Sequence, residues 1–354
     1  RIAREVCTYI LNDMTDEAGG FHSTEDADSE GVEGKFYVWT VDEVKEVLGE
    51  TLAERFCYVF DITEGGNFEG QNIPNLPKTL DQCAAIKQWD VQQLGAEMED
   101  AKAKLLAHRN SRVRPGKDDK VLVSWNGLMI HTMARAGAML DSDEFLEAAA
   151  NAAEFLLQSM RGDDGRLYHT WRHGESKLDA YLDDYANFAN ALVTLYETTF
   201  EVRWLETAVE LASDILEHFI APDGGFYYTA DDHETLIARM KDVQDSSVPS
   251  GNAMAATVLL RLGHLCNRTD FIDAAEGTLS IASKMVNDYP LAIGQMLIAA
   301  DLSLGPVKQI VIAESEETSH ADQIRKRYLP RSVVASPSRS EHLASLSAGR
   351  INQE

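Results

Sequence analysis

The sequence lacks paired cysteines, membrane-length apolar runs and a signal peptide. Its four cysteines lie far apart, at Cys7, Cys57, Cys83 and Cys266, which favours structural thiols in a reducing compartment over a disulfide framework or a metal centre. No apolar run approaches the length of a membrane span, and no basic segment followed by a hydrophobic one opens the chain. We therefore expect a cytoplasmic protein without a membrane partner.

Clustered basic residues are missing as well. The 354 residues include 32 Lys and Arg against 58 Asp and Glu, which gives a formal net charge of -26. Nucleic-acid binding requires clustered Lys and Arg, so we expect no nucleic-acid partner. The sequence contains no phosphate-binding glycine loop, no Gly-x-Ser-x-Gly elbow and no zinc-protease motif. We accordingly predict neither a cofactor nor a metal.

What the sequence does contain is a signature that recurs three times. A Gly-rich turn ending in an aromatic residue precedes a polar acidic segment, which leads to a helix of small residues. The turns occupy residues 19–21, 164–168 and 223–227, and they precede residues 25–28, 182–185 and 249–252. Repetition on this scale predicts helical hairpins around a ring, with acidic and amide residues gathered at one end.

The apolar spacing indicates helices of two kinds. Residues 204–216 carry apolar and acidic residues on opposite faces, as an outer helix does, whereas residues 186–196 are small or apolar on nearly every face, as in an inner helix. We predict the hairpins 122–140 with 143–160, 183–199 with 203–219, and 250–265 with 270–286. Further helices are predicted at 1–14, 41–48, 79–109 with a break near residue 89, and 289–302.

These elements predict an all-α fold, an α/α toroid over residues 1–305, with some members of the ring supplied by sequence upstream of Arg1. After Pro306 the pattern changes. Two short apolar runs at 309–313 and 332–335 flank a helix-like segment at 317–328, which predicts a strand, helix, strand appendage over 306–336. Residues 337–354 are Ser-rich and polar, and we expect a flexible tail there.

Several long motifs resemble the spermatogenesis-associated protein 20 family, whose bacterial members include YyaL. They lie at residues 20–31, 33–40, 118–130, 181–186, 239–242 and 249–252. The resemblance implies an N-terminal thioredoxin-like domain followed by a six-hairpin toroid similar to those of glycosidases and N-acylglucosamine 2-epimerase. This chain is similar to the toroid portion alone, so a thioredoxin-like domain is an expected partner in cis. Sugar chemistry is what the fold relatives imply.

Two acidic segments are the candidate catalytic groups. Asp183 and Asp184 open an inner helix, where one acid serves as a cap and the second is more than a cap requires. Glu25, Asp26 and Asp28 crowd one loop, and close like charges raise a pKa, as a general acid needs. A solvated acidic turn is the alternative there. A calcium loop is disfavoured, because Tyr37 stands where that loop requires Glu.

Further residues are candidates for substrate binding. An aromatic residue with amide and carboxylate neighbours suits a sugar, whose apolar face stacks while its hydroxyls form hydrogen bonds. A buried Trp with a cap is the alternative, and Ser250 also suits an ordinary N-cap after Pro249. His131 and His264 lie on predicted inner helices and are expected to be packed. The binding candidates are His22, Asp119, Lys120, Trp125, Asn126, Tyr181, Tyr185, Lys241, Asp242, Asp245, Ser250 and Asn252.

Two functional hypotheses follow. In the first, the toroid is carbohydrate-active: Asp183 or Asp184 forms an acid/base pair with Glu25, Asp26, Asp28 or Asp119, and Trp125, Tyr181 and Tyr185 stack on the sugar. The reaction would be glycoside hydrolysis or sugar isomerisation. In the second, the toroid is a non-catalytic module that presents a ligand or protein segment to the thioredoxin-like domain. Two carboxyl groups facing one cavity would favour the enzyme, and acids engaged in caps and salt bridges would favour the module.

Overall fold

The computed structural model describes residues 1–234, 237–312 and 319–336. They form two compact units, residues 24–118 and the remainder of the chain. The larger unit, unit 1, joins residues 1–23 to everything after residue 118. The smaller one, unit 2, is therefore an insertion into unit 1. The predicted boundaries had placed residues 24–118 inside the toroid, and the structure separates them from it.

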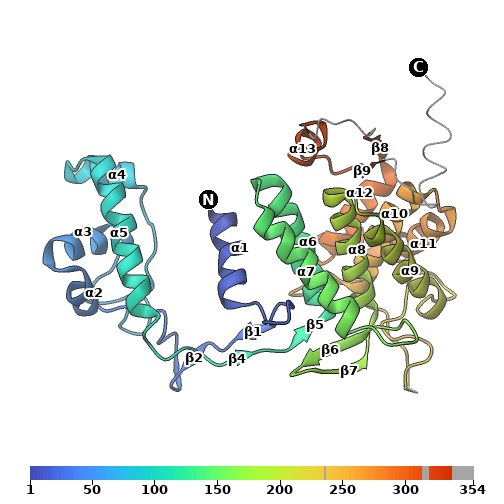
Figure 1. Cartoon of the computed structure of the whole chain (residues 1–354), viewed down its shortest axis with the longest axis horizontal. Coiled ribbons are helices and arrows are strands. Elements are labelled where there is room, and N and C mark those ends of the chain that lie inside the picture. The colour runs from blue at the N-terminus through green and yellow to red at the C-terminus, as the bar shows by residue number, and fades with distance from the viewer. Residues whose placement is uncertain (235–236, 313–318, 337–354) are drawn as a thin grey trace. The chain divides into compact units, whose positions relative to one another are not determined.

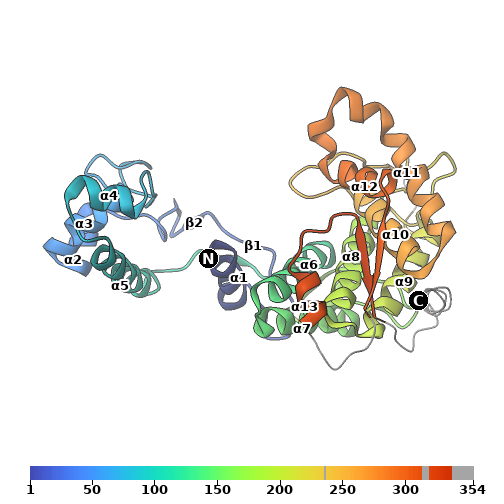
Figure 2. The same ribbon diagram turned by 90° about the horizontal axis from the view of Figure 1, so that it is seen from above.

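Unit 1 consists of helical hairpins (Figures 1 and 2). The inner helices α6, α8, α10 and α12 pack side by side in that order, and the outer helices α7, α9 and α11 each pack on the inner helix before them. The all-α toroid prediction is confirmed in this arrangement. The helices are α1 (Ile2–Asp13), α6 (Val123–Leu140), α7 (Asp143–Ser159), α8 (Leu182–Thr199), α9 (Val202–His218), α10 (Gly251–Cys266), α11 (Thr269–Asp288), the 3-10 helix η1 (Pro290–Ile293) and α12 (Gly294–Leu304).

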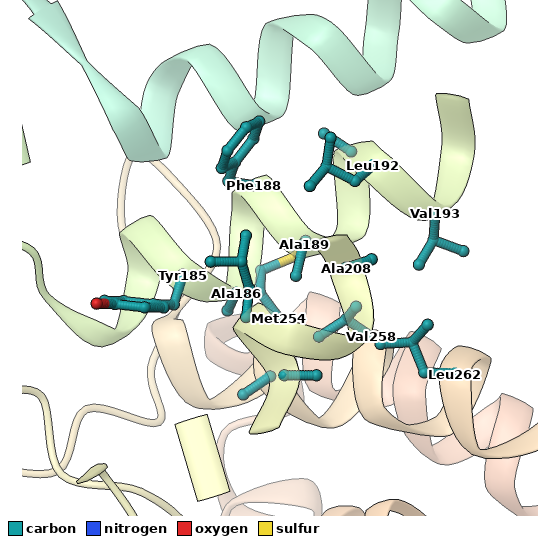
Figure 3. Packing of buried hydrophobic residues seen from close by; sticks show 14 of the residues in the cluster. Tyr185, Ala186, Phe188, Ala189, Leu192, Val193, Ala208, Met254, Val258 and Leu262 are labelled. Atoms are coloured by element: carbon teal, nitrogen blue, oxygen red, sulfur yellow. The ribbon is translucent and has the colours of Figure 1, made fainter. Parts of the chain in front are cut away.

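The inner helices α8 and α10 are buried on nearly every side. Every residue from 184 to 196 of α8 is buried, whereas α9 buries one apolar face. Figure 3 shows side chains of α8, such as Phe188, in one core with Met254 and Val258 of α10. The backbones of α6 and α8 touch at Gly127, where a Cβ atom would lie 2.6 Å from the carbonyl carbon of Asn187. Small residues therefore set how closely the inner helices approach.

The recurring signature forms the same turn three times, after the outer helices α1, α7 and α9. Each turn places a glycine at positive φ: Gly19 at 111°, Gly165 at 87° and Gly224 at 92°. Each is closed by an amide-to-carbonyl hydrogen bond, from Asp16 to Gly20, from Gly162 to Arg166 and from Ala221 to Gly225. Glycine reaches this backbone region without the strain that a Cβ atom causes. The repeat predicted from the sequence is thus a repeat of backbone geometry.

At the end of each turn, a side chain from the first turn of an inner helix forms hydrogen bonds with the backbone. Asn126 bonds the N–H and C=O of Phe21, and Asn252 bonds both groups of Phe226 in the same way. In the second repeat, the hydroxyl of Tyr185 accepts the Leu167 N–H at 3.0 Å. These three side chains are buried and engaged with backbone groups. The structure gives these side chains a role in holding the turns, and their predicted role in substrate binding, including sugar stacking on the buried Tyr185, stays a prediction.

Unit 1 also contains short strands between its helices. Strand β5 (Val121–Leu122) pairs with β6 (Tyr168–Arg172), which pairs with β7 (Glu175–Asp179), all antiparallel. This hairpin was not predicted, and β6 leads the chain back to the start of α8. At the C-terminal side, β8 (Lys308–Val311) pairs in parallel with β9 (Ser332–Ala335), with α13 (Ser319–Arg325) between them. The predicted strand, helix, strand appendage is confirmed, and the predicted tail at 337–354 lies outside the described residues.

Unit 2 has a hydrophobic core of its own, which includes Trp39, Phe56, Leu94 and Met98. Its helix α3 was missed, although Ala53, Phe56 and Val59 have helical spacing, and the predicted break near residue 89 separates α4 from α5. The helices are α2 (Val41–Leu48), α3 (Glu50–Phe60), α4 (Leu80–Lys87) and α5 (Val91–Arg109). The strands are β1 (Thr24–Glu25), β2 (Asp28–Ser29), β3 (Val32–Glu33) and β4 (Lys117–Asp118).

Within the described residues, no helix combines the length and the apolar character that crossing a bilayer requires.

Candidate functional site

The first turn of α8 carries adjacent aspartates in different surroundings. Asp184 is fully buried, and its carboxylate accepts hydrogen bonds from the backbone N–H of Ser124 at 2.8 Å and of Tyr181 at 2.9 Å. The first bond comes from α6 and the second from the residue that precedes α8. Asp184 therefore satisfies free amides at the starts of two inner helices. Its carboxylate is a structural anchor within the site.

His169 of β6 completes the environment of Asp184. Its Nδ1 lies 2.8 Å from Asp184 Oδ2, and its ring packs edge-on against Tyr181 with centroids 5.0 Å apart. Burial by itself would lower the pKa of His169. The hydrogen bond and negative charge of Asp184, with a further contribution from Asp183, outweigh burial and raise this pKa. His169 thus favours its charged form beside the aspartates.

The environment of Asp183 differs from that of Asp184 and raises the pKa of the Asp183 carboxyl group. Burial, followed by the negative charge of Asp184, raises the pKa of Asp183 to about 7, against the smaller lowering effect of His169. Its Oδ1 atom is sealed from solvent and has no hydrogen-bond partner among the described residues. A carboxyl group with a pKa near 7 can both donate and accept a proton at neutral pH. Asp183 is therefore the group in this site suited to proton transfer.

Asp183 lines a cavity of about 340 Å³ at the start of α8 and α10. Tyr228 forms part of the wall, and its ring stacks on Tyr181 with centroids 4.7 Å apart and planes at 10°. Burial, and then the charges of Asp183 and Asp184, raise the pKa of Tyr228, so its phenol stays protonated. The lining residues are Asp183, Tyr228, Met240, Asp242, Ser246, Val248, Pro249, Ser250 and Gly251.

Asp242 brings a second carboxyl group to the same cavity. It is exposed, and its Oδ1 accepts the backbone N–H of Gln244 at 3.1 Å. Its own carbonyl accepts a hydrogen bond from Asn252 Nδ2 at 2.8 Å, which ties this loop to the start of α10. The cavity therefore has one carboxyl with a raised pKa and one in contact with solvent.

Several predicted residues of unit 1 are engaged elsewhere. Arg172 lies 2.5 Å from Asp119, and its hydrogen bond and charge lower the pKa of Asp119 although desolvation opposes them. Lys241 binds Asp223 and the Gly224 carbonyl. Asp245 accepts the backbone N–H groups of Ser250 and Gln295 and so joins the starts of α10 and α12. Each of these three side chains is therefore already paired with other groups of the protein.

The remaining candidates of unit 1 differ in exposure. Ser250 caps α10 by accepting the Ala253 N–H at 3.2 Å, and it also lines the Asp183 cavity. His22 Nδ1 lies 3.3 Å from the Asp119 carbonyl oxygen. The charge of Lys120 contributes to the electrostatics of His169. Trp125, on the first turn of α6, is 42% exposed and keeps a free aromatic surface.

The acidic loop of the other candidate carboxylates belongs to unit 2. Glu25 accepts a hydrogen bond from the Tyr37 hydroxyl at 2.9 Å, and Asp26 accepts the Asp28 N–H at 3.1 Å. Asp26 and Asp28 are exposed. These contacts are those of a solvated acidic turn. Their predicted pairing with Asp183 or Asp184 stays a prediction.

A different group has the geometry of a metal site. Ligand atoms of His218, Asp231 and Asp232 all lie within 4.8 Å of one another. However, His218 pairs with Asp231 at 3.0 Å, and Asp232 pairs with Arg166 at 2.8 Å. These contacts account for the cluster without a metal.

Sequence reasoning missed His169 and Tyr228. His169 reaches Asp184 through the β6–β7 hairpin, and that hairpin was not predicted. Tyr228 follows the third Gly-rich turn, which was interpreted as architecture. The position of Tyr228 directly after a turn that ends beside an inner helix was the available signal.

Comparison with known proteins places the chain in a family. No family model matches it. Human spermatogenesis-associated protein 20 is 31% identical over 94% of this chain. The chain belongs to the spermatogenesis-associated protein 20 family. It spans about half the length of the curated relatives it matches, 48% in the human case. The family resemblance predicted from the motifs is confirmed.

The solved structures that resemble this chain share little sequence identity with it. A sugar epimerase from a ruminal bacterium shares 12% identity and a TM-score of 0.40, over 81% of this chain and 72% of that one. An inactive variant of an α-1,6-mannanase of Salegentibacter, in complex with an α-1,6-mannotetraose, shares 14% identity and a TM-score of 0.39, over 79% and 69%. At these TM-scores the likenesses carry no functional argument for the chain.

Proposed function

We propose that unit 1 performs acid–base chemistry on a sugar or sugar-like metabolite, with Asp183 as the group that transfers the proton. The observation that carries this proposal is the environment of Asp183. The carboxyl group lines a cavity of about 340 Å³, its Oδ1 has no partner among the described residues, and burial beside Asp184 raises its pKa to about 7. Desolvated carboxyl groups of this kind are typical of functional sites.

The neighbours of Asp183 have separate roles in this proposal. Asp184 holds the start of α8 and keeps a negative charge beside Asp183, which favours the protonated form of the latter. His169 holds Asp184 in position through the 2.8 Å contact. Asp184 and His169 are thus positioning residues, and the acid function that the sequence left open between the two aspartates is assigned to Asp183.

The second carboxyl group of the pair is Asp242. It lines the same cavity and is exposed, and in this proposal it acts as the base or nucleophile while Asp183 supplies the proton. Glycoside hydrolysis requires such a pair, and the distance between the carboxyl groups selects retention or inversion. Sugar isomerisation also requires one group that donates a proton and one that accepts it. Asp242 replaces Glu25, Asp26, Asp28 and Asp119 as the proposed partner.

Aromatic and hydroxyl groups around Asp183 suit a carbohydrate. Tyr228 offers a phenol donor in the cavity wall and is fixed by its stacking on Tyr181. A pyranose presents an apolar face to a ring and hydroxyls to polar neighbours. Ser250 and Asp242 supply such neighbours within the same lining.

A binding module is the second candidate. It is favoured by the carboxylates that the structure engages elsewhere: Asp119 with Arg172, Asp184 with backbone amides, and Asp245 with two helix starts. In this alternative, the cavity holds a ligand for a thioredoxin-like domain of the longer protein without changing it. The alternative requires ligand binding but no turnover. With either function, we propose that the protein is cytoplasmic.

A thermal stability screen tests the proposal. The chain is heated with mono- and oligosaccharides, and a ligand at about 100 times its Kd should stabilise it by roughly 2.7 kcal/mol. Asp183→Asn and Asp242→Asn should remove the effect, whereas Asp273→Asn, at an exposed carboxylate of α11, should keep it. Turnover of the bound sugar, lost in Asp183→Asn, supports the enzyme. Binding without turnover supports the module, and a flat screen contradicts both.

A further inference from the structure

A second cavity lies on the inner side of unit 1 and is separate from the Asp183 site. It has a volume of about 300 Å³ and is lined by α6, α8, α10, α12 and the segment that leads into β9. A smaller cavity of about 70 Å³ adjoins it, and the two share Arg135, Glu197, Leu329 and Ser332. Pro249 is the one lining residue in common with the Asp183 cavity. The proposed function does not use this space.

The walls of these two cavities are basic, although the chain carries a formal net charge of -26. Arg135, Arg261, Arg325 and Arg327 line them, and Glu197 is the acidic residue among the lining side chains. A concentration of one charge in a concave surface raises the local concentration of ligands of opposite charge. The cavities therefore have a charge opposite to that of the chain as a whole.

Glu197 is fully engaged by protein groups. Arg261 donates to Glu197 Oε2 at 2.8 Å, and the side chains of this ion pair are 12% and 15% exposed. The Val334 N–H donates to the other carboxylate oxygen at 3.1 Å. Arg261 also bonds Asn190 and Thr194, which fixes its guanidinium. Among the described residues, the arginine that pairs with the Glu197 carboxylate is therefore Arg261 and not Arg135 or Arg327.

Two of the arginines have no such partner. Among the described residues, the guanidinium groups of Arg135 and Arg327 form no hydrogen bond or ion pair, whereas Arg325 pairs with Asp322 at 3.3 Å. The pKa of the neighbouring His131 is affected by the positive charge of nearby arginines. Burial, and then the charges of Arg261 and Arg135, lower the pKa of His131 to about 3. The ring is therefore neutral, and among the described residues no carboxylate pairs with Arg135 or Arg327.

We infer that this cavity binds a small hydroxylated anion, a sugar-sized molecule that carries a carboxylate or phosphate group. Arg135 and Arg327, which both line the smaller adjoining cavity, would meet the anionic group, since a guanidinium presents paired donors that match these oxygens. Asn190 and Gln295 line the larger cavity and supply amide groups for hydroxyls. A volume of this size lies at the lower end of the range for small-molecule pockets, roughly 300–1,000 Å³.

The alternative is that the arginines only complement helix ends. Arg135 lies in the last two turns of α6, where a cation interacts favourably with the free carbonyl groups. That role predicts no saturable binding of an anion. It also predicts no preference between sugars of different charge.

Calorimetric titration distinguishes these possibilities. The full chain is titrated at constant ionic strength with inorganic phosphate, glucose 6-phosphate, gluconate and neutral glucose. We expect saturable binding of glucose 6-phosphate or gluconate, and the comparison of these two ligands identifies phosphate or carboxylate as the preferred group. Arg135→Gln and Arg327→Gln should each weaken this binding about tenfold or more. Arg1→Gln removes the same charge at an exposed site and should have no effect.

The controls separate this site from the Asp183 cavity. Asp183→Asn should leave binding of the anion unchanged, even if it abolishes the proposed sugar chemistry. Equal binding of glucose and of the anions would overturn the inference, as would anion binding that neither arginine variant weakens. The absence of binding by every ligand would also overturn it. Arg327→Gln keeps the test valid if Arg135→Gln does not fold, because Arg327 lies on a different segment.

Discussion

His169 Nδ1 and Asp184 Oδ2 lie 2.8 Å apart, in a pair that links β6 to the first turn of α8. The two adjacent aspartates beside this contact have different surroundings. Asp184 is a buried acceptor with several hydrogen bonds, whereas Asp183 has a raised pKa and an oxygen without a partner among the described residues. The acidic dipeptide therefore combines an anchor with a group suited to proton transfer.

Substitution of the two aspartates should have unequal effects on stability. Asp184→Asn should lower the free energy of unfolding by roughly 2–4 kcal/mol, because an amide cannot accept all of the hydrogen bonds that the buried carboxylate accepts. Asp183→Asn should instead be stabilising at neutral pH, because the raised pKa of Asp183 means that its ionisation destabilises the folded chain there. Urea denaturation measures both values. A loss in Asp183→Asn equal to that in Asp184→Asn would contradict the assigned division of roles.

The pH dependence of stability should reveal Asp183. Its pKa rises from 3.8 to about 7 on folding, so the folded protein retains this proton where the unfolded chain releases it. This group therefore makes the free energy of unfolding fall as pH rises between those values, with no further change above about 7. Asp183→Asn removes that slope. Its stability relative to the unsubstituted chain should rise across this interval and then level off, as measured by urea denaturation in a pH series.

His169 contributes a slope of the same sign in a different interval. Because its pKa is raised above 6.5, its stabilising contribution is complete below the unfolded value and disappears as pH rises through the folded value. His169→Gln in the same pH series should flatten the profile above about pH 6.5. An unchanged profile in this variant would contradict the Asp184 contact.

The repeated turn should depend on its glycine. Gly165→Ala should destabilise unit 1 by roughly 1–2 kcal/mol, because φ is 87° there, while the nearest atom to a new Cβ, Nη2 of Arg161, would lie at an ordinary contact distance of 3.6 Å. Gly277→Ala is the control. It lies within α11 with open space around the added atom, and it should stabilise by about 0.5–1 kcal/mol. Thermal unfolding of both variants separates backbone strain from packing.

Unit 1 should fold without residues 24–118. Thr24 and Asp118 are paired across the antiparallel strands β1 and β4, so Ser23 and Asp119 can be joined by a short Gly-rich linker. The core of unit 2 is separate from that of unit 1. The shortened chain should keep a cooperative thermal transition and its stabilisation by sugars. Retained folding with lost ligand binding would show that Glu25, Asp26, Asp28 or another residue of unit 2 completes the site.

The sequence was sufficient for the repeat and for most helix positions. The turns at Gly19, Gly165 and Gly224 are local, and their backbone requirement is visible in the residue types. The inner helix α8 could be recognised because small and apolar residues surround it on every face. These features depend on neighbours in the chain, which is why composition and spacing predict them.

The candidate site could be predicted only in part. Asp183 and Asp184 were identified, but the choice between them depends on Ser124 and His169, which reach Asp184 from other elements. Asn126 and Asn252 have the residue type of a sugar ligand, yet their amides hold the backbone of Phe21 and Phe226. Side-chain identity does not reveal which partner a polar group meets after folding.

The most direct test is the pKa of the Asp183 carboxyl group. Carbon-13 NMR of aspartate-labelled protein, titrated from pH 3 to 9, follows each carboxyl, and Asp183→Asn identifies the signal by its disappearance. A midpoint near 7 is the predicted result. It should shift when a sugar occupies the cavity. A midpoint near the usual aspartate value, about 3.9, would contradict the assignment of Asp183 as the proton-transferring group.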